Sequence, residues 1–409
     1  MSNTILTLVG SYLPGYKGGG PVRSIENLAA VLGGEFNFKI VTMDRDLRDT
    51  VPYPNIVVDE WVRVGQAEVL YIRPGWRGVI RLTRLLCSVN RDMVVYLNSF
   101  FSRRFSMLAV LLCWLGLCRP RSVVLAPRGE FSPGALSLKK GRKRMYIKMA
   151  RLLGAYRSVI WHANTILDSN YIGAMFRRPT HIAPAISVVS ANGHRELDPT
   201  GAVPAAQDDA SLDGSLSYNR RRKRAGELRV VFLSRISPKK NLVGALRLLG
   251  GASGDVVFDI YGPVEDSGYW AECQKLISVL PANVRVKYCG EIEHENVNSA
   301  FAEHDLFLFP TLGENYGHVI CEALAAGCPV LLSDQTPWRN LEQEGAGWDV
   351  PLSEVERFRA ILQRCIDADD EWYSALSARA AIYAEKHMFA PGVIEANRRL
   401  FRYAFNAAE

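Results

Sequence analysis

Two glutamates bracket a glycine-containing turn in the string FPTLGENYGHVICEALAAGCPVLLSD, residues 309–334. The pattern predicts a strand, a turn, and a helix that begins near His318 and is ended by Gly327. The N-terminus of such a helix presents free backbone N–H groups and the positive end of the helix dipole, which suit a phosphate or a sugar oxygen. Glu314 would lie at the mouth and Glu322 two turns in, where carboxylates accept hydrogen bonds from hydroxyl groups. Taken alone, the two glutamates could also be a loop charge and a helix-capping charge.

Several other chemistries lack their motifs. No Gly-x-Gly-x-x-Gly follows the first predicted strand, and there is no P-loop, nucleophile elbow or zinc-binding helix. Hydride transfer, ATP hydrolysis and serine hydrolysis therefore lose support. The eight cysteines include no Cys-x2-Cys pair, so we expect no metal site and a reducing compartment, the cytoplasm.

The elements that must position these residues alternate along the chain. Short runs rich in Val, Ile and Leu alternate with helical patterns, which predicts βαβ units and parallel sheets. The strands are expected at 4–9, 39–41, 69–72, 93–97, 123–126, 228–236, 256–260, 284–288, 306–309 and 330–332, and helices at 22–32, 80–89 and 391–405.

Composition divides the chain into four parts. Residues 1–190 and 228–385 are expected to form two Rossmann-like domains, and 386–409 a helix that packs on the first of them. Between the domains, residues 191–227 are polar and full of turn formers, as in a linker or mobile loop. The basic run Arg220–Arg224 within it is expected to be solvated, with contact to a membrane or an acceptor as the alternative.

Charge is distributed unevenly between the halves. Residues 1–190 hold 26 Lys and Arg against 11 Asp and Glu, a balance of +15, whereas the rest of the chain has a balance of −8. This asymmetry suggests that the first half meets something anionic. The basic run at 139–144 is either a solvated face or a contact with anionic lipid. The apolar run Phe105–Cys118 is too short to span a bilayer and is predicted to be a buried core helix, or else a segment on the membrane surface.

The string at 309–334 resembles the signature of family-4 retaining glycosyltransferases, and further segments follow the same family in order. FLSRISPKKN at 232–241 resembles the loop whose Arg and Lys bind the donor diphosphate, which implies these roles for Arg235 and Lys240. FDIYGP at 258–263 and VKYCGEIEHENV at 286–297 resemble the segments that approach the nucleotide.

The resemblance implies a donor site built mainly from the second domain. Arg235 and Lys240 would stabilise the leaving diphosphate, Glu314 would hold the donor sugar and Glu322 the ribose. The remaining donor-binding positions it implies are Gly18, Gly19, Gly20, Gly262, Ile292, Asn315, Tyr316, Gly317, His318 and Val319.

In the first domain, the three consecutive glycines in YKGGGPVR, before the first helix, resemble the family's N-terminal glycine loop, although three glycines also suit a merely flexible turn. Many family members carry a histidine after a first-domain strand, near the reacting sugar. This chain has Arg128 there, in APRGEF. Arg128, Glu130 or the more distant His162 could take that acceptor-side role, and His162 could equally be structural.

The resemblance implies the GT-B fold, with two Rossmann-like domains facing across a cleft and the C-terminal helix crossing back to the first. It implies retaining, metal-independent transfer of a hexose from a UDP- or GDP-sugar to a glycan or polyprenyl-diphosphate-linked acceptor in bacterial surface-polysaccharide synthesis. No further cofactor is expected. The location would be cytoplasmic, with peripheral contact to the inner membrane through the basic first domain. A relative that epimerises or hydrolyses a nucleotide sugar is the alternative. A nucleic-acid-binding protein is disfavoured because interleaved aromatic and basic motifs are lacking.

Overall fold

The computed structural model describes residues 3–137, 140–187, 222–388 and 391–407, and it divides into two compact units. The first unit contains the described residues up to 187 together with the C-terminal helix, and the second contains those from 222 to 388. Most of the predicted linker lies outside the described residues. No described helix is both long and apolar enough to cross a membrane.

The first unit is built on an eight-stranded sheet in the order β3-β4-β2-β1-β5-β6-β7-β8. Neighbouring strands run parallel except β3, which pairs antiparallel with β4 at the edge. The central strands are buried along nearly their whole length, as their Val- and Leu-rich sequences require. The strands are β1 Thr4–Leu8, β2 Asn37–Met43, β3 Trp61–Val64, β4 Ala67–Ile72, β5 Met93–Asn98, β6 Ser122–Ala126, β7 Val159–Ala163 and β8 Thr180–Ile182.

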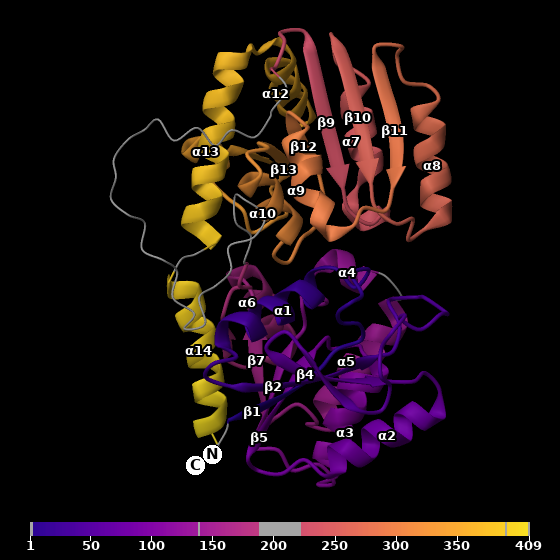
Figure 1. Ribbon diagram of the computed structural model, residues 1–409, viewed down its shortest axis with the longest axis vertical. Helices are drawn as coiled ribbons and strands as arrows, with labels where there is room; N and C mark the ends of the chain where they lie inside the picture. Colours follow the sequence, from indigo (N-terminus) through magenta and orange to yellow (C-terminus); the bar gives the residue numbers. More distant parts are fainter. Residues whose placement is uncertain (1–2, 138–139, 188–221, 389–390, 408–409) are drawn as a thin grey trace. The chain divides into compact units, whose positions relative to one another are not determined.

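Helices connect these strands, and the last helix of the chain completes the unit (Figure 1). Helix α14 is amphipathic. Arg398 of this helix pairs with Glu35 at 2.5 Å, and Phe401 packs against Phe36 and Phe38. The C-terminal helix therefore belongs to the first unit. The helices are α1 Gly20–Leu32, α2 Trp76–Cys87, the π-helical turn η1 Arg103–Met107, α3 Leu108–Trp114, α4 Pro133–Ser137, α5 Lys140–Leu152, α6 Ile166–Phe176 and α14 Pro391–Asn406.

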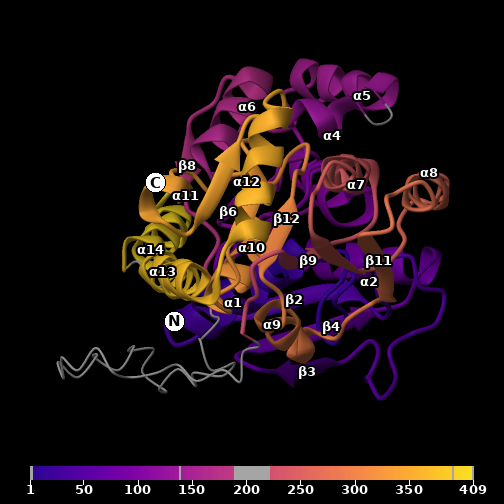
Figure 2. The ribbon, with the colours of Figure 1, turned by 90° about the horizontal axis from the view of Figure 1, so that it is seen from above.

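The second unit has a six-stranded, all-parallel sheet in the order β11-β10-β9-β12-β13-β14. Numbered within the unit, this is the 3-2-1-4-5-6 order of the doubly wound Rossmann fold. In Figure 2 helices α7 and α8 lie side by side. The strands are β9 Glu227–Leu233, β10 Asp255–Tyr261, β11 Val284–Gly290, β12 Leu306–Phe309, β13 Val330–Ser333 and β14 Gly347–Val350. The helices are η2 Pro238–Lys240, α7 Leu242–Leu249, α8 Ser267–Ile277, α9 His294–Ala302, α10 His318–Ala325, α11 Leu341–Glu344, α12 Val355–Asp367 and α13 Asp370–Met388.

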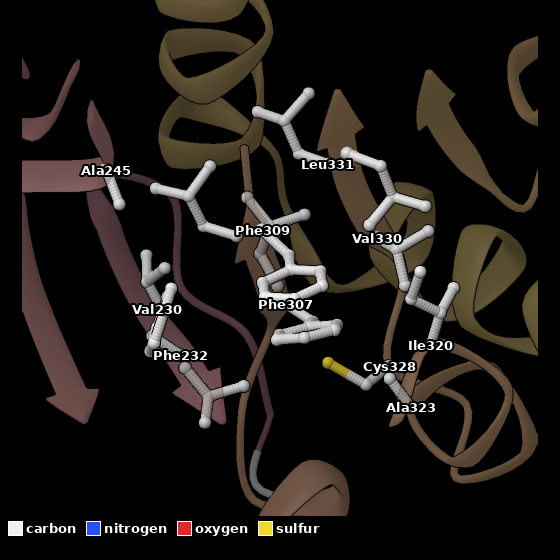
Figure 3. Close-up of a cluster of buried hydrophobic side chains, with 14 of the residues drawn as sticks. Val230, Phe232, Ala245, Phe307, Phe309, Ile320, Ala323, Cys328, Val330 and Leu331 are labelled. Carbon is white, nitrogen blue, oxygen red and sulfur yellow. The ribbon is translucent and has the colours of Figure 1, made fainter. Parts of the chain in front are cut away.

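The core of the second unit forms around β12. Phe307 and Phe309 stack with ring centroids 5.1 Å apart, and Phe232 of β9 meets Phe309 edge-on (Figure 3). Ile320 and Cys328 flank the same cluster and are fully buried. These side chains pack α10 against β12 of the sheet, so both ends of the turn between the two elements are held in place.

Two expectations fail in the structure. The apolar run Phe105–Cys118 is not one buried helix, because α3 ends at Trp114 and covers the sheet with one face only. Leu111, Trp114, Leu115 and Leu117 are each about half exposed. The basic run Arg220–Arg224 was expected to be solvated, but its residue Lys223 is only 3 % exposed. The Lys223 ammonium donates to the backbone carbonyl of Arg224 and to those of Ile366 and Ala368 at the end of α12.

Candidate active site

The best-formed candidate site lies at the carboxyl ends of β9 and β12 in the second unit. The two strands are parallel neighbours, but the strand order continues from β9 to β10 on one side and from β12 to β13 on the other. Their carboxyl ends therefore form the switch point at which ligands bind in doubly wound folds. The loop after β9 carries Arg235 and the short helix η2 with Lys240, and the turn after β12 carries Glu314. The structure therefore places Arg235, Lys240 and Glu314 at one edge of the sheet and brings Lys240 and Glu314, 74 residues apart in sequence, into contact.

Lys240 and Glu314 form an ion pair at this edge. Both side chains are largely shielded from water, with exposed fractions of 11 % and 14 %. Burial alone would raise the pKa of the Glu314 carboxyl, but Lys240 and then Lys239 lower it to about 2. Glu314 is thus ionised throughout the neutral range and can act as a hydrogen-bond acceptor, not as an acid.

The turn that carries Glu314 is fastened on both sides. Its N–H donates to Gln335 O at 2.9 Å, and the Leu312 N–H donates to Lys239 O at 2.9 Å. Gly317 has φ 83° and immediately precedes α10, where a Cβ would lie 2.9 Å from Glu314 Cγ. Only glycine suits this position, since it has a left-handed backbone and no room for a side chain.

Arg235 lies on the same edge but has a different partner. Its guanidinium pairs with Glu265 at 3.0 Å, and 37 % of the Arg235 side chain is exposed. Next to Arg235, the backbone of Gly262 comes close to that of Ser234. Gly262 has φ 128°, and an added Cβ would lie only 2.0 Å from Ser234 O. Of the two residues predicted to bind the diphosphate, Lys240 therefore lies in a buried ion pair and Arg235 in a more exposed one.

The other predicted donor-binding residues follow the two loops. Asn315, Tyr316 and Gly317 form the turn, and His318 and Val319 open α10. Glu322 lies half-buried in α10 about one turn from its start, not two, because the helix begins at His318. Ile292 packs on the core beyond β11.

The glycine loop of the first unit follows β1 and leads into α1. Gly19 has φ 66° and ψ −138°, a combination that essentially only glycine adopts. Gly18 has no room for a side chain, since a Cβ would lie 2.2 Å from Ser11 Oγ, and Gly20 is the first residue of the helix. As predicted, Pro21 follows at the helix start.

A carboxylate from the next strand's loop holds this glycine loop in place. Asp46 follows β2 and is 6 % exposed. Its Oδ2 accepts from the N–H groups of Tyr16 at 2.7 Å and Lys17 at 2.9 Å, and its Oδ1 accepts from Leu47 N–H. Lys17 also pairs with Asp49 at 3.0 Å. Nothing in the local sequence distinguishes Asp46 from its acidic neighbours, so sequence reasoning missed it.

Arg128 lies at the carboxyl end of β6 with φ 55°, and three neutral oxygens hold its guanidinium. Nη2 donates to Tyr96 Oη and Asn98 Oδ1 at 2.8 Å each, and Nη1 donates to Asn164 Oδ1 at 2.9 Å. Tyr96 and Asn98 come from the end of β5, and Asn164 follows β7. Three neighbouring strands thus converge on one cation.

His162 and Glu130, the other two candidates for the acceptor side, are occupied in structural contacts. His162 Nε2 donates to Ala183 O at 2.8 Å, so Nδ1 accepts from Tyr96 Oη at 2.9 Å. Burial lowers the pKa of His162 to about 3, so the ring stays neutral. Glu130 accepts from Ser99 Oγ and from the Phe100 N–H at 2.5 Å. Within the described residues, no group of three His, Cys, Asp or Glu side chains is placed to hold a metal ion.

The family comparison concerns the second half of the chain. Residues 218–386 match the family described as Glycosyl transferases group 1. Phosphatidyl-myo-inositol mannosyltransferase of Mycolicibacterium smegmatis is 30 % identical over 158 residues, 37 % of this chain and 39 % of that protein. GDP-mannose-dependent alpha-mannosyltransferase of the same organism is 31 % identical over 147 residues, 36 % of this chain and 34 % of that protein. The matches thus span well under half of either relative.

The structural comparison covers nearly the whole chain. Anabaena HepE, solved in complex with UDP and glucose, matches with a TM-score of 0.64 over 97 % of this chain and 98 % of its own. At 17 % identity this likeness shows the fold alone. It agrees with the two doubly wound sheets and with the α/β class that the sequence predicts. Residues 218–386 are therefore similar to the group 1 glycosyl transferases, and the chain that carries them has the GT-B fold.

Proposed function

We propose that this chain transfers a hexose from a UDP- or GDP-sugar to a hydroxyl of a glycan or lipid-linked acceptor, with retention at the anomeric carbon and without a metal. The observation that carries the proposal is the buried Lys240–Glu314 pair at the switch point of the second unit. A cation and an ionised carboxylate held side by side suit a donor that has both phosphates and sugar hydroxyls.

In the proposed reaction, each charge has a separate task. Bond cleavage leaves negative charge on the departing nucleoside diphosphate, and Lys240 with Arg235 would stabilise it. Glu314 would accept hydrogen bonds from the donor sugar, a role that fits a carboxyl with a pKa of about 2. Glu322 would hold the ribose. Because no well-placed nucleophilic carboxylate is expected, the acceptor would attack from the face that the diphosphate leaves, and a donor phosphate oxygen would take its proton.

The proposed donors follow from the relatives. One curated relative is named for GDP-mannose, and HepE was solved with UDP and glucose. The acceptor, which we place in bacterial surface-polysaccharide synthesis, and the retaining outcome rest on the sequence resemblance.

We also propose that α5 brings the first unit to an anionic membrane. Its exposed residues include the basic Arg142, Arg144 and Lys148 and the apolar Met149 and Leu152, the last of them 83 % exposed. No acidic residue occurs between 133 and 158. This combination suits a helix lying on anionic lipid. Of the predicted basic run, Lys139 lies outside the described residues, and Lys143 donates to Ala135 O at 2.6 Å.

The proposed membrane contact predicts co-flotation with vesicles that contain anionic lipid and not with neutral ones. The variant Arg144→Glu/Lys148→Glu should lose this binding, whereas the same charge reversals at exposed Arg359 and Arg364 in the second unit should retain it. Equal flotation of both variants would contradict the contact through α5.

Product analysis tests the proposed reaction. The protein is incubated with UDP- and GDP-hexoses and a lipid extract, and products are followed by nucleotide release and by the anomeric proton signal. The proposal predicts a lipid- or glycan-linked hexose with the donor's anomeric configuration. A free hexose or an epimerised nucleotide sugar, with no acceptor product, would instead identify a hydrolase or epimerase.

A further inference from the structure

Arg128 in the first unit is a cation whose guanidinium is held by uncharged oxygens. Arg128 is half-buried, and its four hydrogen bonds all go to the oxygens of Tyr96, Asn98 and Asn164. Within the described part of the chain, no Asp or Glu oxygen forms an ion pair with its guanidinium. A charge that is shielded from water normally has a charged partner, so this half-buried guanidinium lacks the direct counterion that such a position usually has.

The neighbouring titratable groups leave that charge in place. His162 is neutral because its pKa is lowered to about 3, and the buried Tyr96 hydroxyl has a raised pKa. The carboxylate of Glu130 is used by the N–H groups of residues 100 and 101. Asp168 is the remaining nearby acid; it stands beside the Asn164 N–H, not against the guanidinium.

The guanidinium is also fixed in direction. Its contacts come from the ends of β5 and β7, and Arg128 keeps a left-handed backbone with φ 55° that a residue with a side chain adopts only when its surroundings impose it. The four bonds use the Nε–H, both Nη2–H groups and one Nη1–H, so one of the five N–H donors remains for a ligand. The group therefore presents one N–H donor and a positive charge in a fixed direction.

We propose that Arg128 binds a phosphate group of a substrate at the carboxyl edge of the first unit's sheet. The guanidinium is suited to a phosphate by charge and by planar geometry. The choice of ligand rests on the proposed function, in which the substrates bring phosphates from two sources. These are the diphosphate of the donor nucleotide and the phosphate of a lipid-linked acceptor.

Inorganic pyrophosphate is the probe for the shared chemistry. The full-length Lys240→Met variant removes the second unit's main phosphate cation, and we expect it to bind pyrophosphate still, in calorimetric titration. Adding Arg128→Met should weaken that binding at least tenfold, and adding Arg128→Lys should weaken it less, since the charge is kept. The matched control Lys240→Met/Arg121→Met removes a cation whose Nε donates to Phe405 O at the opposite end of β6. It should bind pyrophosphate as Lys240→Met does.

Two results would overturn the proposal. One is a Lys240→Met protein that does not bind pyrophosphate. The other is that folded Lys240→Met/Arg128→Met and Lys240→Met/Arg128→Lys proteins both bind pyrophosphate as tightly as Lys240→Met does. Far-ultraviolet circular dichroism establishes that each variant is folded. Failure of the wild type to bind either UDP or GDP would contradict the proposed function and not the anion site.

Titration of the single Arg128→Met variant with the nucleoside diphosphate that the wild type binds separates the two sources. A tenfold loss of affinity assigns Arg128 to the donor diphosphate. An unchanged affinity, together with lost pyrophosphate binding in the Lys240→Met background, assigns it to the phosphate of the acceptor. Either outcome supports the site.

Discussion

The two units have the same sheet topology around the switch point, yet they hold their cations differently. In the second unit, Lys240 and Arg235 are each paired with a glutamate, Glu314 and Glu265. In the first unit, Arg128 is held by neutral oxygens, while the carboxylates of Asp46 and Glu130 bind backbone N–H groups.

This difference separates two uses of charge at the edge of a sheet. A cation paired with a carboxylate is neutralised until a phosphate displaces its partner, and the released carboxylate can then accept hydrogen bonds from hydroxyls. Asp46 and Glu130, by contrast, accept hydrogen bonds from backbone N–H groups and so hold loops in place. Under the proposed function, the second unit would therefore exchange the partners of its cations, whereas the first unit would keep its loops fixed around Arg128.

The largest effect is expected from Lys240→Met. It removes the proposed stabilisation of the leaving diphosphate and should lower kcat by about 10²–10³. It also leaves the buried Glu314 carboxylate without its cation, which typically costs about 3–5 kcal/mol of stability. Adding Glu314→Gln should restore stability without restoring activity. A double variant as unstable as Lys240→Met would show that the pair does not act as a unit.

Opposite pH dependences should distinguish the units. Burial raises the pKa of Asp168 to about 6, despite the opposing effects of the Asn164 N–H and Arg128, from 3.8 in the unfolded chain. The folded state then binds more protons between these values, so this group's contribution to stability rises as pH falls from 6 to 4. Glu314, with a folded pKa of about 2 against 4.5, stabilises above pH 4.5 and loses that contribution as pH falls toward 2.

Denaturant unfolding of the wild type, Asp168→Asn and Glu314→Gln at several pH values measures both effects. The free energy of unfolding of Asp168→Asn, relative to that of the wild type, should be up to about 3 kcal/mol higher at pH 7.5 than at pH 4, given 1.36 kcal/mol per pKa unit. The deficit of Glu314→Gln should shrink between pH 4.5 and the lowest pH at which the protein folds. A deficit or gain independent of pH in either variant would refute the corresponding electrostatic assignment.

A smaller effect is expected from Gly317→Ala. The new Cβ would meet Ile320 Cδ1 at 2.7 Å and Glu314 Cγ at 2.9 Å, at a φ of 83°. The strain costs about 1–3 kcal/mol and displaces Glu314, so both thermal stability and kcat should fall. Gly251→Ala is the control, since its Cβ would make ordinary contact with Arg359 at 3.6 Å. Equal kcat for the two variants would mean that Glu314 tolerates displacement.

The smallest effect is expected at Asp46. Asp46→Ala leaves the N–H groups of Tyr16, Lys17 and Leu47 without their acceptor, which costs about 1–3 kcal/mol. Asp46→Asn keeps one acceptor oxygen and should recover part of this. If Asp46 positions the glycine loop, the KM for the donor should rise more in Asp46→Ala than in Asp46→Asn. A stability loss with unchanged KM would limit Asp46 to a structural role.

The sequence predicted what is encoded locally. The start of α10 was predictable because Gly317 and the apolar spacing after it are adjacent, and most central strands were found from their Val and Leu content. The edge strands β3 and β8 were missed because they are short and half-exposed. β7 and β14 were also missed. The central Ile160-Trp161-His162 of β7 is bulky and partly polar, and β14 has only four residues.

The candidate site was harder to predict because its partners are distant in sequence. Lys240 and Glu314 are 74 residues apart, and only the family resemblance linked them before the structure did. The role of His162 depended on Tyr96, 66 residues away, and on Ala183, so no local pattern could exclude it from the chemistry. Partner choice at a sheet edge depends on topology, which spacing does not reveal.

The most direct test of the central claim is calorimetric titration of the wild type, Lys240→Met and Lys275→Met with UDP and with GDP. Lys275 is an exposed lysine of α8 in the same unit, so its variant controls for loss of one surface charge. We predict that one nucleoside diphosphate binds the wild type and Lys275→Met with micromolar Kd and that Lys240→Met loses this binding. Equal affinity in all three proteins, or no binding of either nucleotide to the wild type, would contradict the assignment of the donor site.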